Sequence, residues 1–362
     1  MNPLASIPTP ALLVDAPQVR RNVARVVAYA AGHGLAYRPH VKTHKSSWIG
    51  ALQVEGGAAG LTCATDREAE VMRTASDDLL VAYPPVVPAR LARLAALARG
   101  SRLAVALDSL ESAERFSESL RAHGAGASVL VEVDAGMRRT GVATPHAAVD
   151  LARRVDALPA LAFAGFAFYP GHIRSAGPES EAALSALGGL IEEVRASTVA
   201  AGLEVRVISG GSTPLLWRSH EIRGLTELRA GTCVYFDRTS VLGGVCEEGE
   251  CAATILATVV STAVAGRAVV DAGVKALGRE PVRGGPGEGW AAVQGRPEVA
   301  VAALSEEHGM LDLSGSDWRP SVGEQVRLVP NHVCVAVHLF DDMHVLEAEG
   351  TVTRRPIDAR GR

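Results

Sequence analysis

The strongest constraint on the fold is an alternation of two kinds of segment. Over roughly 200 residues, short apolar segments rich in Val, Leu and Ala alternate with amphipathic ones. The apolar segments show little polar–apolar alternation, which is typical of strands buried on both faces. Eight strands are predicted: YRPHVK 37–42, LTCA 61–64, LLVAY 79–83, RLAVALD 102–108, VLVEVD 129–134, AFAGFAFY 162–169, VRVIS 205–209 and a weak ELRAG 227–231.

Helix-like segments lie between these strands, for example at 66–75 and 109–124. The second of them opens with Ser109, a candidate N-cap, and ends at Gly124, a C-cap signal. Eight strand–helix units predict an α/β fold with an N-terminal TIM-like (β/α)8 barrel. A doubly wound open sheet is the alternative.

The sequence changes character after about Val241. Segments 253–264, 267–273, 324–339 and 343–355 are rich in β-branched residues, with period-two stretches and Gly or Pro breaks. This pattern predicts a C-terminal antiparallel β domain, with 278–289 as a surface loop. The segment ALLVD 11–15 precedes the first barrel helix and is assigned to the same domain. The predicted domains are a barrel at 16–240, and a β domain formed by 1–15 and 241–362.

Composition excludes several classes of protein. The net charge of −4, with no basic stripe, makes nucleic acid an unexpected partner. No apolar run reaches the roughly 18 residues of a membrane span, and the first 15 residues lack the pattern of a secretory signal. Five cysteines without a regular spacing are interpreted as free thiols. A cytoplasmic protein is therefore expected, with no membrane partner.

Polar and glycine residues gather where the predicted barrel strands end, which is where barrel enzymes place their active sites. The seventh strand runs into SGGSTP 209–214. Glycines let backbone N–H groups approach an anion, and a following helix N-terminus would add favourable partial charge. The segment is therefore interpreted as a phosphate-binding loop, and a plain Gly-Ser turn is the alternative.

The end of the first strand carries a candidate catalytic lysine. Strand alternation would place His40, Lys42 and His44 on one face. If that face points into the barrel mouth, burial lowers the pKa of Lys42, and its neutral amine can form a Schiff base with an aldehyde. Combined with a phosphate-binding loop, such a lysine suggests pyridoxal 5′-phosphate (PLP). The alternative is a salt bridge at the rim, while Lys45 is expected to be solvated.

The segment PNHVC 330–334 holds two candidate metal ligands. On a strand, His332 and Cys334 would face the same way, and imidazole with thiolate suits zinc or a similar divalent ion. His338 shares the predicted face but would lie roughly 20 Å from His332 at strand spacing. The alternative is a buried cysteine beside a hydrogen-bonded histidine.

Several of these motifs also carry a resemblance to a known family. RPHVKTHK, LTCAT, YPGH, SGGSTP, ELRAGTCVYFD, DAGVKAL, SEEHG and PNHVC, in this order, resemble the D-threonine aldolase and D-serine dehydratase family. Its members are metal-dependent, fold-type III PLP enzymes with an alanine racemase-like fold. The resemblance extends from Pro8 to about Glu349. The segment DAGMRRTGV 134–142 is similar to the Gly-Met-x-Arg segment of alanine racemases.

The resemblance implies a role for each candidate residue. Lys42 would hold PLP covalently, Tyr169 would lie beside the cofactor, and His172 would lie close by. Arg139 would approach the ring oxygen or the substrate carboxylate. The resemblance further implies a homodimer in which part of each site comes from the partner chain. The phosphate would be bound by Ser209, Gly210, Gly211, Ser212, Thr213 and Tyr235, and a divalent metal (Zn²⁺ or Mn²⁺, with Mg²⁺ as a further option) by His332 and Cys334.

The implied activity is that of a lyase on β-hydroxy-D-amino acids, with D-threonine-type aldol cleavage to glycine and an aldehyde expected first. Dehydration of D-serine or 3-hydroxy-D-aspartate to a keto acid and ammonia is the runner-up. Ile173, Arg174 and Ser175 follow His172, and none is a good base, which weakens the aldolase prediction. Arg174 could instead read an acidic substrate side chain. A racemase and a non-catalytic PLP-binding regulator are the remaining alternatives.

Overall fold

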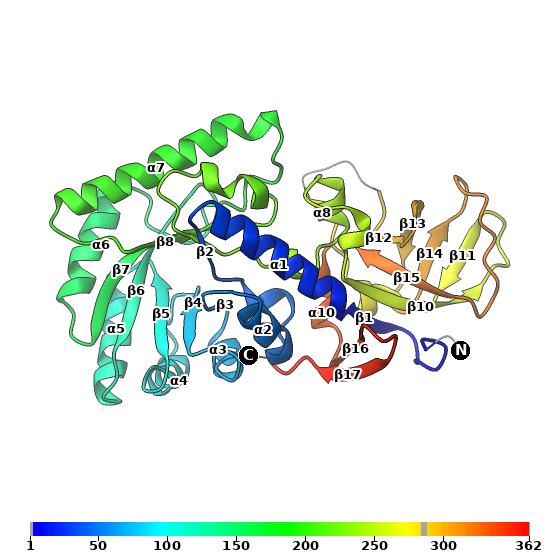
Figure 1. Cartoon of the computed structure of the whole chain (residues 1–362), viewed down its shortest axis with the longest axis horizontal. Coiled ribbons are helices and arrows are strands. Elements are labelled where there is room, and N and C mark those ends of the chain that lie inside the picture. Colours follow the sequence, from blue (N-terminus) through cyan, green and yellow to red (C-terminus); the bar gives the residue numbers. More distant parts are fainter. Residues whose placement is uncertain (1–2, 284–287, 362) are drawn as a thin grey trace. The chain divides into compact units, whose positions relative to one another are not determined.

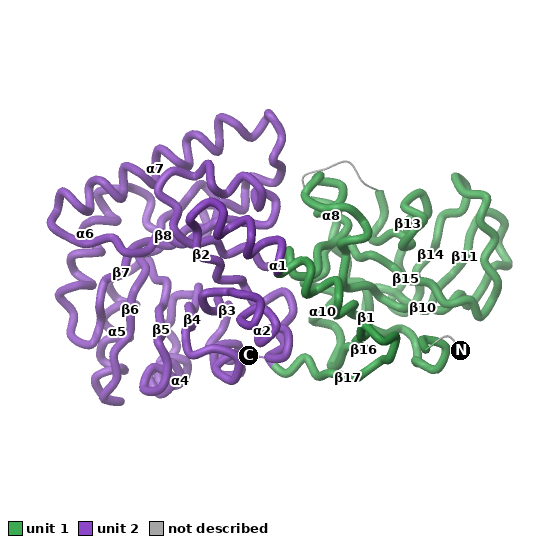
Figure 2. Tube along the Cα trace, viewed as in Figure 1, with its two compact units in different colours: residues 1–23, 232–358 green, residues 24–231, 359–362 purple. Residues whose placement is uncertain are grey.

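The computed structural model describes residues 3–283 and 288–361. The chain divides into two compact units, residues 1–23 with 232–358 (unit 1) and residues 24–231 with 359–362 (unit 2) (Figure 2). The first junction falls within helix α1 (Ala16–Gly32), whereas the predicted boundary lay at the start of this helix.

Unit 2 contains an eight-stranded parallel sheet in the order β2-β9-β8-β7-β6-β5-β4-β3. A parallel bridge between His40 and Thr62 joins the segment after β2 to β3 and closes the sheet into a barrel. This sequential, closed order confirms the predicted barrel rather than the doubly wound sheet. The strands are β2 (Ala36–Tyr37), β3 (Leu61–Cys63), β4 (Asp78–Val81), β5 (Arg102–Leu107), β6 (Ala127–Val133), β7 (Leu161–Phe168), β8 (Val207–Gly210) and β9 (Glu227–Leu228).

Helices flank these strands (Figure 1). Apolar strand residues such as Val105 and Val129 pack with Phe116 and Leu94 of the helices in one buried cluster. As predicted, Ser109 caps its helix, since its hydroxyl accepts the N–H of Ser112 at 3.3 Å. The helices are α1, α2 (Ser47–Glu55), α3 (Asp66–Met72), α4 (Pro88–Ala98), α5 (Leu110–Ala122), α6 (Pro145–Ala157) and α7 (Glu181–Ala200), with 3₁₀ helices at Val41–Thr43, Pro178–Ser180 and Leu216–Glu221.

The prediction of a strand over 37–42 is wrong beyond Tyr37. The segment Val41–Thr43 forms a 3₁₀ helix, and the Nδ1 atom of His40 accepts the N–H of Lys42 at 3.4 Å. Pro39 cannot donate a backbone hydrogen bond, which favours ending the ladder before it. Strand alternation therefore does not place His40, Lys42 and His44 on one face.

Unit 1 is built on a nine-stranded sheet in the order β11-β14-β13-β12-β15-β10-β1-β16-β17. A second pairing of β10 with β11 closes six of these strands into a barrel. All pairs are antiparallel except β1 with β16, so the predicted antiparallel domain contains one parallel pair. The strands are β1 (Ala11–Asp15), β10 (Ala253–Ser261), β11 (Arg267–Val270), β12 (Ala291–Val293), β13 (Arg296–Leu304), β14 (Gly309–Asp312), β15 (Gln325–Pro330), β16 (Asp342–Leu346) and β17 (Val352–Pro356).

The predicted strand over 324–339 is wrong in its second half. Strand β15 ends at Pro330, and a short helix, α10 (Val333–His338), follows with His332 as its N-cap. The distance between His332 and His338 that was estimated from strand spacing therefore does not apply. Two further short helices in unit 1 are α8 (Arg238–Leu242) and α9 (Val274–Leu277), with a 3₁₀ turn at Glu248–Glu250.

Three smaller predictions can also be compared with the structure. The predicted loop 278–289 includes residues 284–287, which lie outside the described residues, and its described part contains no helix or strand. All five cysteines are free, as expected. Among the described residues, every helix is too short or too polar to span a bilayer.

Candidate active site

The candidate catalytic residues of unit 2 follow the carboxyl ends of its parallel strands. Lys42 lies after β2, Arg139 in the loop after β6, and Tyr169 directly after β7. The ring of Tyr169 brings the other two side chains together. The Nζ atom of Lys42 lies 5.5 Å from the ring centroid, and the guanidinium carbon of Arg139 lies 5.4 Å from it.

The two neighbouring lysines differ from the prediction. Lys42 is exposed, so the expected burial of its amine is not observed. Lys45 is the shielded lysine, since its side chain is only 14% exposed and forms an ion pair with the fully buried Glu68. Glu68 also accepts the backbone N–H of Ala64, which fixes its carboxylate and commits Lys45 to a structural contact.

The imidazole of His172 lies over the loop after β6. A Cβ atom added at Gly136 would lie 2.8 Å from the Cε1 atom of His172, and Gly136 has a φ of +109°. Both features favour glycine at this position. The carboxylate of Asp134 accepts the N–H groups of Gly136 and Arg138, which shapes the loop that carries Arg139. His172 and Arg139 therefore belong to adjoining loops at the same end of the barrel.

The loop after β8 has the features of an anion site. A Cβ atom at Gly210 would lie 2.3 Å from the ring of Phe168, and Gly211 has a φ of +91°, so both positions favour glycine. Ser212 and Thr213 are buried, and the hydroxyl of Ser212 has no hydrogen-bond partner among the described residues. A buried hydroxyl without a partner is costly unless a ligand satisfies it.

Three details of the predicted phosphate site are different in the structure. The segment that follows the loop is a 3₁₀ helix of six residues, Leu216–Glu221, and not the α-helix whose N-terminus was expected to add partial charge. The hydroxyl of Ser209 donates to the carboxylate of Glu227 at 2.6 Å and is already used. The side chain of Tyr235 is fully buried within unit 1, where its hydroxyl lies 3.8 Å from the sulfur of Met343.

Sequence reasoning missed one charged residue next to this loop. Arg229 follows β9, is 9% exposed, and donates to the carbonyl of Phe168 at 2.7 Å. Its Nε atom has no partner among the described residues. Burial lowers the pKa of Arg229, and Glu132 and Glu227 act against this shift. The segment ELRAG was interpreted as a strand and as part of a family motif, but Arg229 was given no role, although an arginine within an otherwise buried strand end is itself a functional signal.

The candidate metal ligands lie in unit 1, at the start of α10. The Nδ1 atom of His332 lies 3.2 Å from the Oδ2 atom of Asp237. The sulfur of Cys334, in the first turn, lies 3.7 Å from the hydroxyl of Thr232. Burial would lower the pKa of His332, but the Cys334 thiolate and the Asp237 carboxylate outweigh it and raise this pKa to about 10.

Asp237 is the second residue that sequence reasoning missed. Its Oδ1 atom accepts the N–H of Ser240 at 2.9 Å and caps α8, while Oδ2 faces His332. A carboxylate that orients a histidine in this way is common around metal sites. The described residues contain no cluster of three or more His, Cys, Asp or Glu side chains arranged around a common ion. His332 and Cys334 therefore offer two ligands with chemistry suited to a divalent ion, and leave positions for other ligands.

Comparison with known proteins identifies the class of this chain. Residues 14–239 match the family model described as alanine racemase, N-terminal domain, and residues 252–346 match the one described as putative serine dehydratase domain. The chain belongs to the alanine racemase-like family of PLP enzymes, in the branch that carries a D-serine dehydratase-like domain. This confirms the resemblance inferred from the motifs.

Individual relatives narrow this class to lyases. The chain is 32% identical to D-threo-3-hydroxyaspartate dehydratase of Delftia sp. (strain HT23), covering 96% of this chain and 97% of the relative. The crystal structure of D-threonine aldolase from Filomicrobium marinum superposes with a TM-score of 0.90 at 30% identity, covering 99% and 97% of the two chains. A cysteine-to-alanine variant of D-threo-3-hydroxyaspartate dehydratase in the metal-free form also has a TM-score of 0.90, at 29% identity and full coverage of both chains. The chain is accordingly a lyase of the PLP-dependent type that acts on D-amino acids.

Proposed function

We propose that this protein is a PLP- and divalent-metal-dependent lyase acting on β-hydroxy-D-amino acids, with D-threonine-type aldol cleavage as its main reaction. One observation carries this proposal. The amine of Lys42 and the guanidinium of Arg139 both lie within 5.5 Å of the centroid of one ring, that of Tyr169, at the catalytic end of the barrel. A nucleophilic amine and a carboxylate-binding cation are the two groups that an amino-acid-transforming PLP site needs.

The residues present fit PLP. Lys42 supplies the amine for covalent attachment, and the loop Gly210–Thr213 supplies backbone N–H groups and hydroxyls for the phosphate. The Ser212 hydroxyl supports this assignment, because it is buried and lacks a partner among the described residues. When bound, PLP supplies an electron sink for negative charge at the substrate Cα. Ser209 and Tyr235 are left out of the assignment, because their hydroxyls already contact Glu227 and Met343.

The remaining side chains of unit 2 orient the substrate and move protons. Arg139 is exposed and free to bind a carboxylate, while its contact with Tyr169 limits where the guanidinium can lie. The contact of His172 with the Gly136 loop holds its imidazole at the same end of the barrel. An imidazole can both accept and donate a proton, so His172 is the proposed proton-transfer group.

The donor set of unit 1 fits a divalent metal ion. We assign His332 and Cys334 as its protein ligands, with Asp237 orienting the imidazole of His332. Such an ion would lower the pKa of the substrate β-hydroxyl and polarise its C–O bond. Zinc and manganese are both compatible with an imidazole–thiolate pair, although the thiolate favours zinc.

Dehydration is the second candidate reaction, and the residues after His172 favour it. Ile173 is buried, and the hydroxyl of Ser175 bonds to Glu179 and Ser180. Neither residue can activate the substrate hydroxyl as a base. If the α-proton is removed instead, the hydroxyl leaves and the products are a keto acid and ammonia. Arg174 is exposed next to His172 and suits a substrate with an acidic side chain.

Product analysis tests the proposal. Purified protein with PLP and either Mn²⁺ or Zn²⁺ is incubated with D-threonine, D-serine and 3-hydroxy-D-aspartate, with L-threonine as the control. Glycine with an aldehyde supports aldol cleavage, whereas a keto acid with ammonia supports dehydration. Appearance of the opposite enantiomer would indicate a racemase, and bound PLP without turnover would indicate a regulator.

The metal assignment has its own test. Cys334→Ala should weaken metal binding and turnover at least tenfold while PLP stays bound, with the buried Cys63→Ala as the matched cysteine control. Full activity after exhaustive chelation would refute the assignment. The predicted homodimer is tested separately, by sedimentation of the PLP-loaded protein.

A further inference from the structure

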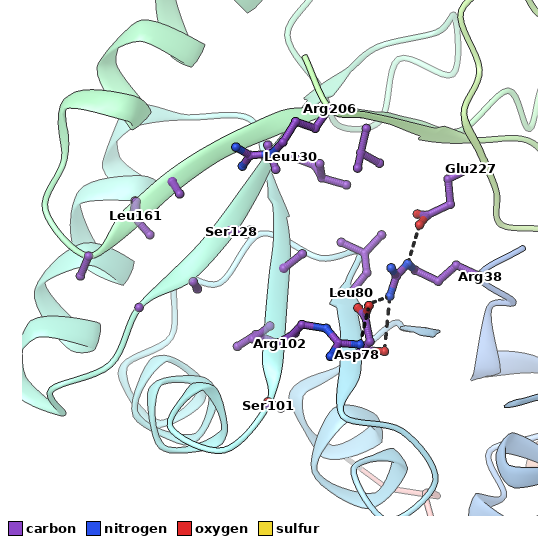
Figure 3. A pocket seen from close by; sticks show the side chains of 18 residues that line it. Arg38, Asp78, Leu80, Ser101, Arg102, Ser128, Leu130, Leu161, Arg206 and Glu227 are labelled. Atoms are coloured by element: carbon purple, nitrogen blue, oxygen red, sulfur yellow. Dashed lines mark hydrogen bonds and ion pairs between the residues drawn. The ribbon is translucent and has the colours of Figure 1, made fainter. Parts of the chain in front are cut away.

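A cavity lies at the end of the unit 2 barrel opposite to the catalytic loops. It has a volume of about 600 Å³ and is lined mostly by residues in the amino-terminal halves of the strands (Figure 3). Arg38, Arg102 and Arg206 supply positive charge, Asp78 and Glu227 supply negative charge, and the lining also includes the hydroxyl residue Ser128 together with Leu80 and Leu130. The volume falls within the range of roughly 300–1,000 Å³ that is usual for small-molecule sites.

Small residues at one level of the barrel explain the hollow. The strand register aligns Leu80 with Ala104, Ala104 with Ser128, and Ser128 with Ala162. Interiors of such barrels are usually filled by bulky branched side chains in layers. Here three neighbouring strands present Ala, Ser and Ala at one level, so the layer is left unfilled.

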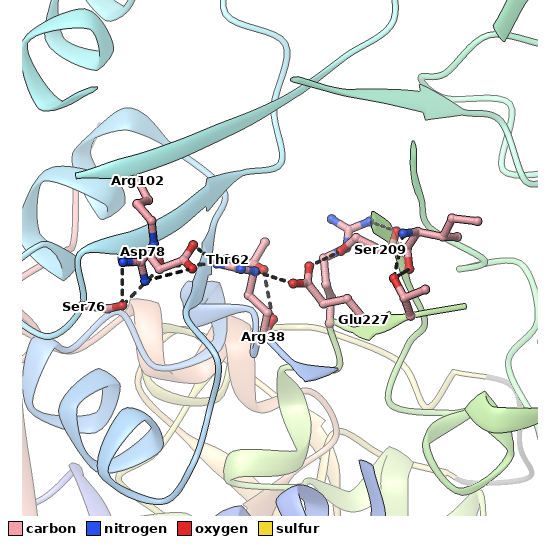
Figure 4. A network of polar contacts seen from close by, with 10 residues as sticks. Arg38, Thr62, Ser76, Asp78, Arg102, Ser209 and Glu227 are labelled. Carbon is pink, nitrogen blue, oxygen red and sulfur yellow. Dashed lines mark hydrogen bonds and ion pairs between the residues drawn. The ribbon is translucent and has the colours of Figure 1, made fainter. Parts of the chain in front are cut away.

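The acidic groups of the cavity are already neutralised. Arg38 donates from Nε to Glu227 at 2.7 Å and from a terminal nitrogen to Asp78 at 2.5 Å (Figure 4). Glu227 also accepts the hydroxyl of Ser209 at 2.6 Å. Both carboxylates thus have short partners, and the cavity does not call for a cation.

Positive charge and a hydroxyl remain available. Three guanidiniums line the cavity against two carboxylates, which leaves one excess positive charge. Arg206 is the least committed of them, since it reaches the carbonyl of Phe163 at 3.1 Å and Glu204 only at 3.6 Å. Glu204 is 76% exposed, so this ion pair is weak. Ser128 is half-buried in the cavity lining, where its hydroxyl can bind a further polar atom.

We propose that this cavity binds a small organic carboxylate with an apolar body, at a site separate from the catalytic one. The carboxylate would pair with Arg206 and accept the hydroxyl of Ser128. The apolar body would lie against Leu80, Leu130 and Ala104, the apolar side chains of the lining. Charge complementarity selects the anion, and the unfilled level of the barrel selects the apolar body.

Four probes of related shape test the ligand chemistry. Hexanoate has both the carboxylate and the apolar body. Acetate lacks the apolar body, hexan-1-ol lacks the negative charge, and hexylammonium carries a positive charge instead. Each is titrated by ligand-observed NMR and calorimetry into the protein with PLP in excess, so that the cofactor site is filled. Hexanoate is expected to bind one to one and at least tenfold more tightly than the other three. Equal binding of hexylammonium, or no binding of hexanoate, would overturn the proposal.

Variants locate the binding. Arg206→Gln removes the cation, and Ala104→Leu fills the hollow; each should weaken hexanoate binding at least tenfold. Arg195→Gln is the matched control, because Arg195 is exposed on α7 and pairs with Glu192. Thermal melting checks that each variant is folded. If Ala104→Leu fails to fold, Arg206→Gln and the probe series decide the question, and unchanged hexanoate binding in Arg206→Gln refutes the site.

Discussion

The two ends of the unit 2 barrel differ in whether their buried polar groups have partners. At the amino end, Arg38, Asp78 and Glu227 satisfy one another through contacts of 2.5–2.7 Å. At the carboxyl end, the Ser212 hydroxyl and the Arg229 Nε atom are buried without partners among the described residues. Since an unsatisfied buried polar atom costs about 1–3 kcal/mol, the carboxyl end gives up stability that a ligand can restore.

This difference separates the structural charges of the barrel from its functional ones. Lys45 and Lys42 show the same difference although they are three residues apart. Lys45 pairs with buried Glu68, whereas Lys42 is exposed beside Tyr169. Charges of the first kind should affect stability when removed, and charges of the second kind should affect cofactor binding and turnover.

The largest expected effect is that of Lys42→Ala. Loss of the amine should remove the visible absorbance of covalently bound PLP and lower kcat at least about 10³-fold, with little change in stability. Lys45→Ala should keep the absorbance but lower the free energy of unfolding by about 3 kcal/mol, since it leaves Glu68 buried and unpaired. Absorption spectra and urea unfolding measure both. Loss of the band in Lys45→Ala alone would reverse the assignment.

The next effect is on stability at the amino end. Arg38→Met should lower the free energy of unfolding by about 3–5 kcal/mol, because Asp78 and Glu227 both lose their closest cation. Arg102→Met is the matched control, since Arg102 is 76% exposed and lies 3.3 Å from Asp78, and should cost less than about 1 kcal/mol. Equal losses of unfolding free energy in the two variants, measured by urea unfolding, would show that the ion pairs of Arg38 stabilise the fold no more than the exposed pair of Arg102.

Acid should lower the stability of unit 2 through a buried histidine, His44. Burial lowers the pKa of His44 from 6.5 to about 3, and its hydrogen bonds to Gln53 and Ser46 only partly oppose this. The unfolded chain therefore binds the extra proton between these values. Stability from neutral His44 is complete above pH 6.5 and falls by about 1.4 kcal/mol per pH unit as the pH drops toward 3.

The variant His44→Gln isolates this contribution. It cannot titrate, so unfolding free energies measured from pH 7 to pH 4 should fall less steeply than in the wild type. An identical slope in both proteins would exclude His44 as the source. Carboxylates titrate in the same range, but they are common to both proteins and cancel in the difference.

The smallest effects are expected at Ser209 and Ser212, the two serines that flank Gly210 and Gly211. Ser212→Ala should weaken PLP binding about tenfold and leave the stability of the cofactor-free protein unchanged or higher. Ser209→Ala should lower stability by about 1–2 kcal/mol, because Glu227 loses a hydrogen bond, while PLP affinity changes little. Fluorescence titration with PLP and urea unfolding distinguish the two. A loss of PLP affinity only in Ser209→Ala would place the phosphate elsewhere.

Local sequence pattern was sufficient for most of the architecture. Strands such as β5 and β7 were predicted within one or two residues, because a run of buried apolar residues admits few other structures. The roles of the motifs around Lys42, Gly210 and His332 stay predictions, drawn from residue types that their chemistry needs in order. Predictions failed where local hydrogen bonds compete with a strand, as at Val41–Thr43 and in α10.

Apolar periodicity and residue type are enough to predict the barrel and the β-rich second unit and to select the candidate catalytic groups. Which charges pair depends on how the chain folds in three dimensions. The partner of Lys45 is 23 residues away, and the two partners of Arg38 are 40 and 189 residues away. Such contacts depend on barrel closure and strand register, so they leave no local pattern in the sequence. The unfilled level of the barrel between β4 and β7 also depends on strand register and leaves no such pattern.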